Sequence, residues 1–199
     1  MAKPRIAVII GSTRSDRLAD KPACWILEQA QRRGDLDVDL LDLRDHPVPF
    51  FDEKGPMMRM PAENAEALRW QERLSRYDGF IFVVAEYNHS ITGVLKNALD
   101  SAYHQWVRKP FTAIGYGGTG AARAVEHLRL VATALQMVST SGAVHIAGGD
   151  FMAITPMGAN KPIKEIEAHL IPSATASLDE LTWWTRATMA ARAADRQPT

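Results

Sequence analysis

The sequence predicts an α/β fold in three layers, with helices on both faces of a doubly wound, five-stranded parallel sheet. Residues 6–10 and 79–84 are unbroken apolar runs, without the alternation of half-exposed strands, and suit central strands buried on both faces. Strand-like and helix-like segments alternate along the chain, as in parallel α/β proteins. A length of 199 residues fits one domain, so we expect a single domain over residues 1–199.

The first half of the chain contains three predicted strands and two predicted helices. After the strand at 6–10, residues 16–33 form a helical pattern that ends at Gly34, a residue typical of helix ends. Residues 38–43 read V-D-L-L-D-L, a mixed pattern that suits an edge strand. Residues 62–77 show an apolar helix face among charges and precede the strand at 79–84.

The second half continues the alternation. A helix is predicted at 92–106, and Pro110 stands before the strand at 111–116, where a missing N–H does least harm. Residues 121–137 carry apolar residues at spacings of three and four, and a short strand at 144–147 and a helix at 173–194 complete the chain. Right-handed crossovers then give the flavodoxin-like strand order 2-1-3-4-5, and the loops after strands 1, 3 and 4 should share one crevice.

Composition excludes several classes of protein. Lys plus Arg and Asp plus Glu both number 23, so there is no basic excess for nucleic acid or an anionic membrane. No apolar run is long enough for a membrane span, and the start lacks the apolar stretch of a signal peptide. The one cysteine, Cys24, forms no internal disulfide and is expected to be a small core residue. We expect a soluble, cytoplasmic protein.

The loop after the first strand has the residues of an anion site. Gly11 turns the chain, and Ser12, Arg14 and Arg17 follow it with hydroxyl, guanidinium and backbone N–H groups near a helix start. The pattern is neither a dinucleotide fingerprint nor a Walker A loop. A plain βα turn with solvated arginines is the alternative.

Two further loops suit a flat ligand. After the third strand, Ala85, Glu86, Tyr87 and Asn88 offer amides and an aromatic ring suited to a planar heterocycle. His89 and Glu86 lack a recognisable partner, so no catalytic acid or base is expected.

After the fourth strand, Tyr116, Gly117 and Gly118 let the backbone approach a flat ligand closely. The same glycines are also typical of a loop that is merely flexible, which is the alternative. No metal-ligand motif or hydrolase nucleophile motif is present.

Two other loops are unusually apolar. Residues 44–60 contain Phe50, Phe51 and three methionines, and residues 148–162 contain Phe151, Met152 and Met157. Such residues favour a binding surface or a subunit contact, and a loop packed on its own core is the alternative.

The motifs G-S-T-R, E-Y-N-H-S with L-K-N-A-L-D, and Y-G-G-T-G, in this order over about residues 4–150, resemble those of the NADPH-dependent FMN reductases. That family includes quinone, azo-dye and chromate reductases. The resemblance implies an enzyme that passes hydride from NADPH or NADH through bound FMN to a small-molecule acceptor such as a quinone, a flavin or an azo compound. It also implies a homodimer or homotetramer.

The resemblance assigns the FMN phosphate to Ser12, Arg14 and Arg17. It places residues 85–88 along the isoalloxazine and ribityl chain, largely through backbone contacts, and Tyr116, Gly117 and Gly118 at the other edge of the ring. The cofactor carries the chemistry, so the protein supplies no acid or base. The chain has Ala85 where the family commonly has proline, so we expect a less restrained loop there. A flavodoxin-type electron carrier or a flavin-binding interaction module remains the alternative, although carriers are usually acidic.

Overall fold

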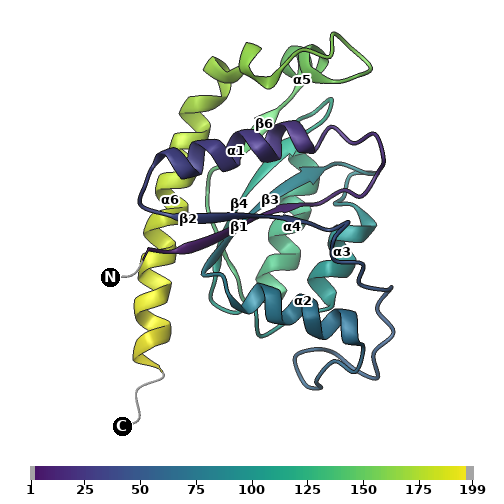
Figure 1. Ribbon diagram of the computed structural model, residues 1–199, viewed down its shortest axis with the longest axis vertical. Helices are drawn as coiled ribbons and strands as arrows, with labels where there is room; N and C mark the ends of the chain where they lie inside the picture. The colour runs from purple at the N-terminus through teal and green to yellow at the C-terminus, as the bar shows by residue number, and fades with distance from the viewer. Residues whose placement is uncertain (1–2, 196–199) are drawn as a thin grey trace.

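The computed structural model describes residues 3–195 and shows a parallel sheet with helices packed around it (Figure 1). The strand order is β2-β1-β3-β4-β5, and β6 also pairs with β4. The strands are β1 (Arg5–Ile10), β2 (Asp37–Asp42), β3 (Gly79–Ala85), β4 (Pro110–Tyr116), β5 (Val138–Ser139) and β6 (Val144–Ile146). The predicted fold class and flavodoxin-like order are therefore confirmed.

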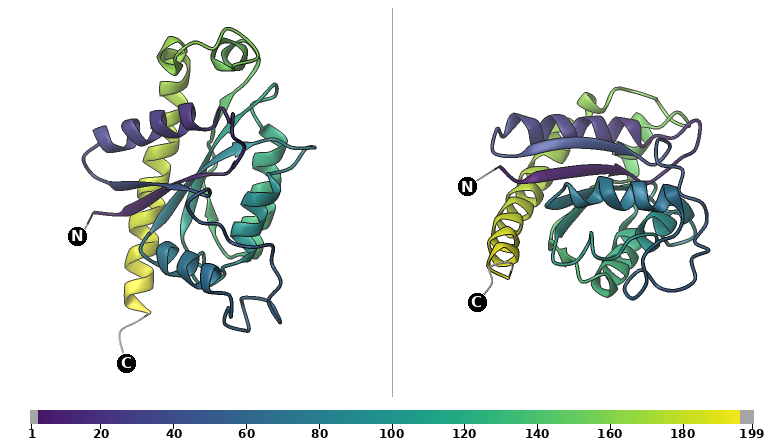
Figure 2. Two further views of the ribbon diagram at one scale, coloured as in Figure 1. Left: turned by 45° about the vertical axis from the view of Figure 1, so that its right-hand side comes forward. Right: turned by 60° about the horizontal axis from the view of Figure 1, so that its bottom comes forward.

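Helices connect the strands and cover both faces. They are α1 (Asp20–Arg32), α2 (Ala65–Ser75), α3 (Gly93–Asp100), α4 (Ala122–Ala134), α5 (Gly148–Ile154) and α6 (Glu167–Ala194), with a short 3₁₀ turn at Ile163–Glu165. Figure 2 shows α1 and α2 on opposite sides of the strands. Within residues 3–195, no helix combines the length and apolar character that crossing a membrane requires.

Two apolar cores bury the two faces of the sheet. Along β1, Ile6, Val8 and Ile10 pack with side chains of α1 and α6, while Ala7 and Ile9 pack with those of α2, α3 and α4. Successive side chains of a strand point to opposite faces of the sheet, so each central strand contributes to both cores. The helices packed on the two faces exclude water from both. The unbroken apolar runs of β1 and β3 follow from this burial.

The edge beside β4 differs from the prediction of five strands. Two short strands occupy the fifth position: β5 pairs with Pro110 and Phe111, and β6 pairs with residues 114–116 of the same strand. Residues 138–139 are too few to produce a periodic pattern, so the sequence showed one strand where the structure has two.

Two helices have limits that differ by several residues from those predicted, and packing decides both. Helix α3 ends at Asp100 instead of reaching Trp106, because the Trp106 ring turns into the core, with its centroid 4.7 Å from that of Phe80. Helix α6 begins before Pro172, since Leu170 is buried in the core despite the hydrogen bond that proline removes.

The predicted loop at 148–162 contains α5, whose two leading glycines disfavour a helix in isolation. Burial of Ile154, which is fully inaccessible to solvent, stabilises this short helix. Cys24 was expected in the core, but its side chain is exposed on α1.

Candidate functional site

A cavity of about 290 Å³ lies at the carboxyl ends of β1, β3 and β4. Eight of the ten predicted site residues line it: Ser12, Arg14, Arg17, Ala85, Glu86, Tyr87, Tyr116 and Gly117. Asn88 and Gly118 do not line it. The three loops therefore meet where the strand order reverses, as the topology predicts.

Gly11 fits β1 tightly against its neighbours at the start of the first loop. Its N–H donates to the Val83 carbonyl oxygen at 3.0 Å, and a Cβ at this position would lie 2.8 Å from that same oxygen. The buried Thr92 hydroxyl donates to the Gly11 carbonyl and accepts from the Leu95 N–H at 3.2 Å, so it caps α3. Thus α3 anchors the turn that presents Ser12.

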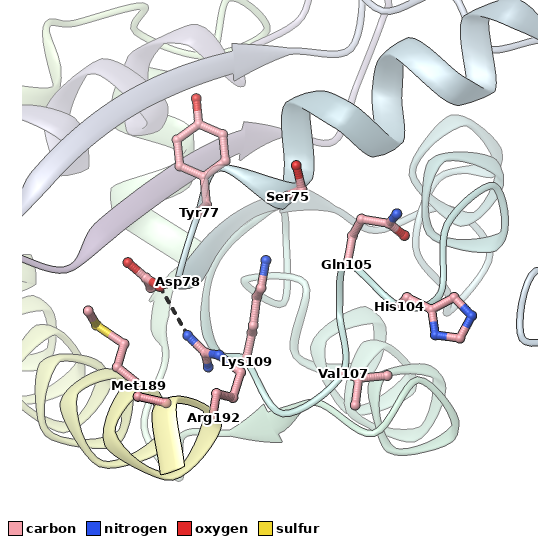
Figure 3. Close-up of a pocket in the computed structure, with 10 residues that line it drawn as sticks. Ser75, Tyr77, Asp78, His104, Gln105, Val107, Lys109, Met189 and Arg192 are labelled. Carbon is pink, nitrogen blue, oxygen red and sulfur yellow. Dashed lines mark hydrogen bonds and ion pairs between the residues drawn. The ribbon is translucent and has the colours of Figure 1, made fainter. Parts of the chain in front are cut away.

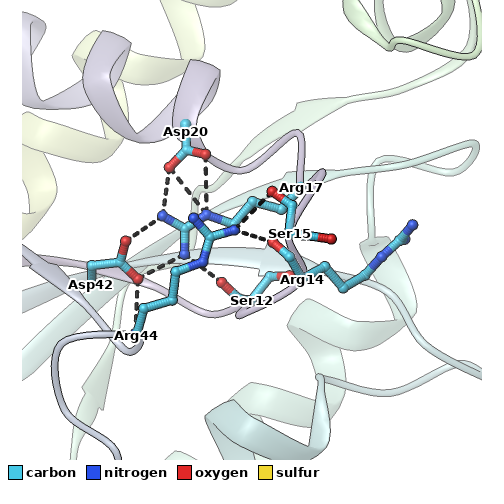
Figure 4. A network of polar contacts seen from close by, with 7 residues as sticks. All are labelled: Ser12, Arg14, Ser15, Arg17, Asp20, Asp42 and Arg44. Carbon is cyan, nitrogen blue, oxygen red and sulfur yellow. Dashed lines mark hydrogen bonds and ion pairs between the residues drawn. The ribbon is translucent and has the colours of Figure 1, made fainter.

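Arg17 is a central group of the loop, because its side chain is only 2% exposed and reaches three partners (Figure 4). One guanidinium nitrogen donates to the Ser12 carbonyl at 2.6 Å and to Asp42 Oδ1 at 2.7 Å. Its Nε donates to Asp20 at 3.0 Å. The hydrogen bond to Asp42 is the main reason that the pKa of Arg17 is raised. These contacts join β2, the loop and α1.

Asp42, at the end of β2, also organises a second arginine. It accepts from the Arg44 N–H at 2.9 Å, and the Arg44 guanidinium donates to the carbonyl oxygens of Arg14 and Ser15. Burial acts to raise the pKa of Asp42, but the hydrogen bonds from Arg17 and Arg44 outweigh it and keep the pKa below its ordinary value. Asp42 and Arg44 are loop-positioning residues that sequence reasoning missed.

Arg14 differs from Arg17 and Arg44. Its side chain extends away from the network of Figure 4, is exposed and lines the cavity. Among residues 3–195, no hydrogen bond or ion pair engages its guanidinium. Of the two predicted phosphate-binding arginines, Arg14 is therefore the one available to a ligand.

The loop after β3 is a tight hairpin. Tyr87 and Ser90 exchange backbone hydrogen bonds of 2.8 Å and 3.0 Å, and the two residues between them, Asn88 and His89, have φ angles of 50° and 67°. Two central residues with positive φ are typical of the two-residue turns that match strand twist. This turn directs Asn88 and His89 to solvent and leaves Tyr87 at the cavity.

Glu86 joins this hairpin to α4. Its carboxylate, 9% exposed, accepts hydrogen bonds from the Arg123 guanidinium, with an Nε distance of 2.7 Å, and from the Ala124 N–H at 3.4 Å. The α4 N-cap, Ala121, has no capping side chain of its own, so Glu86 supplies a negative charge at that helix start. These bonds and the hairpin restrain the loop in which Ala85 stands in place of proline.

Glycines allow close packing and a left-handed backbone at the end of β4 and in the loop after it. A Cβ on Gly115 would lie 2.2 Å from the Gly120 carbonyl oxygen, and Gly120 itself has φ +64°. Tyr116 is nearly buried, which is the main reason that its pKa is raised, so the phenol stays neutral. A Cβ on Gly118 would meet nothing within 4 Å, so the backbone here is open.

The cavity has a fourth wall that the sequence analysis did not assign to it. This wall consists of Phe151 of α5 and the following Thr155, Pro156 and Met157, while Asp16 and Leu18, from the segment between β1 and α1, also line the cavity. The apolar character of residues 148–162 was visible in the sequence, and their position after the last strand was the signal that could have placed them here.

A wider cavity of about 490 Å³ lies at the opposite, amino end of the strands (Figure 3). Tyr77 and Asp78 precede β3 and Lys109 precedes β4, and Asp78 accepts a hydrogen bond from Arg192 at 3.0 Å. Ligands of doubly wound sheets bind at the carboxyl ends of strands, so we assign the functional site to the smaller cavity. No group of three His, Cys, Asp or Glu side chains suited to a metal occurs within residues 3–195.

Comparison with known proteins finds consistent similarities. The family profile described as NADPH-dependent FMN reductase matches residues 4–150. The chain is 39% identical over 136 residues to the NAD(P)H-dependent FMN reductase C4B3.06c of Schizosaccharomyces pombe, covering 67% of this chain and 68% of that protein. It is 33% identical over 141 residues to a 2-hydroxy-1,4-benzoquinone reductase of a Burkholderia species, covering 67% of this chain and 73% of that protein.

A solved structure has the same fold. It is the flavoenzyme FerB of Paracoccus denitrificans, named as an NAD(P)H:(acceptor) oxidoreductase. The TM-score is 0.69 at 24% identity, and the match covers 93% of this chain and 98% of FerB.

Proposed function

Because the chain belongs to the NADPH-dependent FMN reductase family, we propose that the cavity at β1, β3 and β4 binds FMN and transfers reducing equivalents from NAD(P)H to quinones or azo compounds. Family membership makes the chain an NAD(P)H-dependent oxidoreductase. The observation that supports FMN most strongly is the convergence of eight predicted cofactor residues on one cavity.

The phosphate end of FMN fits the first loop. Arg14 offers a guanidinium that no carboxylate engages within the described chain, and a charge-assisted hydrogen bond to a phosphate is among the strong ones. Ser12 lies beside it, in a loop whose shape is set by Arg17, Asp42 and Arg44 before any ligand arrives. A preorganised loop costs little to order on binding.

The ring end fits the other two loops. The open backbone at Gly117 admits a flat group at close range, and Tyr87 and Tyr116 present aromatic surface to it. Residues 85–87 line the same cavity, and the Glu86 carboxylate is paired with Arg123. Glu86 would thus act through its main chain.

Bound FMN would supply the hydride-transfer chemistry of the overall reaction, in which NAD(P)H, one proton and a quinone give NAD(P)⁺ and the hydroquinone. The residues of this chain bind and orient the reactants. Neither the solvent-facing His89 nor the ion-paired Glu86 is placed to move a proton.

The visible spectrum tests this proposal. Purified protein is titrated with FMN, and NADPH or NADH is then added without oxygen. We expect a perturbed flavin spectrum that bleaches on addition of the nicotinamide and recovers on addition of a quinone. Absence of any bound flavin would overturn the proposal, and a flavin reduced only by a partner protein would indicate an electron carrier instead.

A further inference from the structure

The fourth wall of the cavity, made of Phe151, Thr155, Pro156 and Met157, comes from α5 and the turn after it. Three features of this wall indicate its role: the hydrogen bonds that hold it in place, the side chains that line the cavity, and the solvent exposure of those side chains. No residue of the loops after β1, β3 and β4 contributes to this wall.

The segment that carries the wall is closed on itself. After α5, the N–H groups of Ala159 and Lys161 donate to carbonyl oxygens of the helix at 2.9 Å and 2.8 Å, and the N–H of Asn160 donates to the Thr155 carbonyl at 3.1 Å. A Cβ on Gly158 would lie 2.1 Å from the Met152 carbonyl oxygen, so the turn packs directly on the helix. Residues 152–161 therefore form a compact unit.

One lysine fastens this unit to the rest of the molecule. Lys21, on α1, extends its ammonium to the Ile154 carbonyl at 2.7 Å, the Asn160 side-chain oxygen at 2.9 Å and the Lys161 carbonyl at 2.9 Å. All three donor positions of the ammonium are thereby used. Because α1 directly follows the phosphate loop, Lys21 ties the wall to that loop.

The wall presents apolar surface at the cavity mouth. Phe151 is half-buried, whereas Met157 is 82% exposed although it lines the cavity. Thr155, which also lines the cavity, is buried. With a cofactor in the cavity, the exposed surface of Met157 would remain for a second flat molecule, and flexible methionines adapt to varied aromatic partners.

We propose that Phe151, Thr155, Pro156 and Met157 form the acceptor side of the site, that Phe151 and Met157 contact an uncharged aromatic acceptor of the quinone class, and that Lys21 is the residue that positions them. This inference depends on the proposed FMN function. It adds that the chain's own α5 segment selects the acceptor.

The test compares Met157→Ala with Met152→Ala, because Met152 is an exposed methionine of α5 that does not line the cavity. For a bicyclic quinone, Met157→Ala is expected to lower kcat/KM by roughly three- to tenfold through KM, the size of effect expected for lost apolar contact. The FMN dissociation constant and the rate of flavin reduction by NADPH should stay as in the wild type, and Met152→Ala should change none of these.

Lys21 is tested by Lys21→Met and by Lys21→Arg. The first should raise the quinone KM with little change in kcat, and the second should restore it in part, a rescue that a general loss of stability does not produce. Unchanged quinone KM in both Met157→Ala and Lys21→Met would overturn the inference. An altered FMN affinity in Met157→Ala would instead assign the wall to the cofactor. Loss of FMN binding in the wild type itself would overturn the proposed function, so the two failures are distinct.

Discussion

Individual residues of the loop after β1 divide into those that are available to a ligand and those that hold the loop in place. Arg14 and Arg17 carry the same guanidinium group three positions apart. Arg14 lines the cavity without a partner in the described chain, whereas the guanidinium of Arg17 donates hydrogen bonds to Asp42, Asp20 and a backbone carbonyl. Sequence alone cannot separate them, because the partner of Arg17 lies on β2, 25 residues away. Removing either arginine should therefore have different consequences.

Arg14→Ala is expected to weaken FMN binding by roughly 1.5–3 kcal/mol, the value of a hydrogen bond to a charged group, while leaving the free energy of unfolding nearly unchanged. Isothermal titration with FMN measures the first quantity and urea denaturation the second. Arg59→Ala, at an exposed arginine outside the cavity, is the matched control. An unchanged FMN dissociation constant in Arg14→Ala would place the phosphate elsewhere.

Asp42→Asn is expected to lower the free energy of unfolding at pH 7 by about 1–3 kcal/mol, because it removes the charge that engages the nearly buried Arg17. The pKa of Asp42 is lower in the folded protein than its ordinary value of 3.8. The folded state is therefore stabilised by the ionised carboxylate above that value, and this stabilisation is lost as the pH falls through the folded pKa.

Urea denaturation of wild type and Asp42→Asn at pH 7 and near pH 3 checks this prediction. The difference in stability between the two proteins should be large at neutral pH and should shrink in acid. A difference that is the same at both values would show that the charge of Asp42 does not stabilise the loop.

At the scale of elements, apolar periodicity predicted most of the architecture, and packing decided the remainder. The runs of β1 and β3 are unambiguous because both faces are buried. The C-terminal end of α3 and the start of α6 depend on the burial of Trp106 and Leu170 in the core. Strand β5 forms because it can pair with the free edge of β4. Local sequence contains none of this information.

The candidate site shows the same division. Motifs located the three loops, since the carboxyl ends of adjacent parallel strands must meet. They did not reveal which side chains turn inward, which is decided by long-range pairs such as Glu86 with Arg123 and Arg17 with Asp42. The wall from α5 was missed because two glycines obscured the helix.

The ion pair between Glu86 in the loop after β3 and Arg123 on α4 has an interaction free energy that a double-mutant cycle can measure. Glu86→Ala and Arg123→Ala should each destabilise the protein, and the double variant should be less destabilised than the sum of the two, by roughly 1 kcal/mol. Chemical denaturation of the four proteins in the cycle gives this value. Additive effects would mean that the ion pair does not connect the two elements energetically.

At the scale of the whole molecule, the loop at 44–60 combines an anchored base with an exposed tip. The Asn97 side chain accepts from the Phe51 N–H at 2.9 Å and donates to the Pro49 carbonyl at 2.8 Å, and Met57 is buried. Phe50, by contrast, is 84% exposed, and Met58 is 45% exposed. The loop thus packs on its own core and still presents apolar surface.

We propose that this surface is where two copies of the chain meet, since an apolar tip fixed by an anchored base is costly to leave in water. Light scattering after gel filtration should give a mass at least twice that of the 22.0 kDa chain. Phe50→Asp should shift the mass toward the single chain by burying a charge at the contact, with FMN affinity retained because Phe50 does not line the cavity. Leu130→Ser, which replaces another strongly exposed apolar residue on α4, should leave the mass unchanged. A wild type that elutes as a single chain, or a Phe50→Asp variant of unaltered mass, would contradict this assignment of the loop.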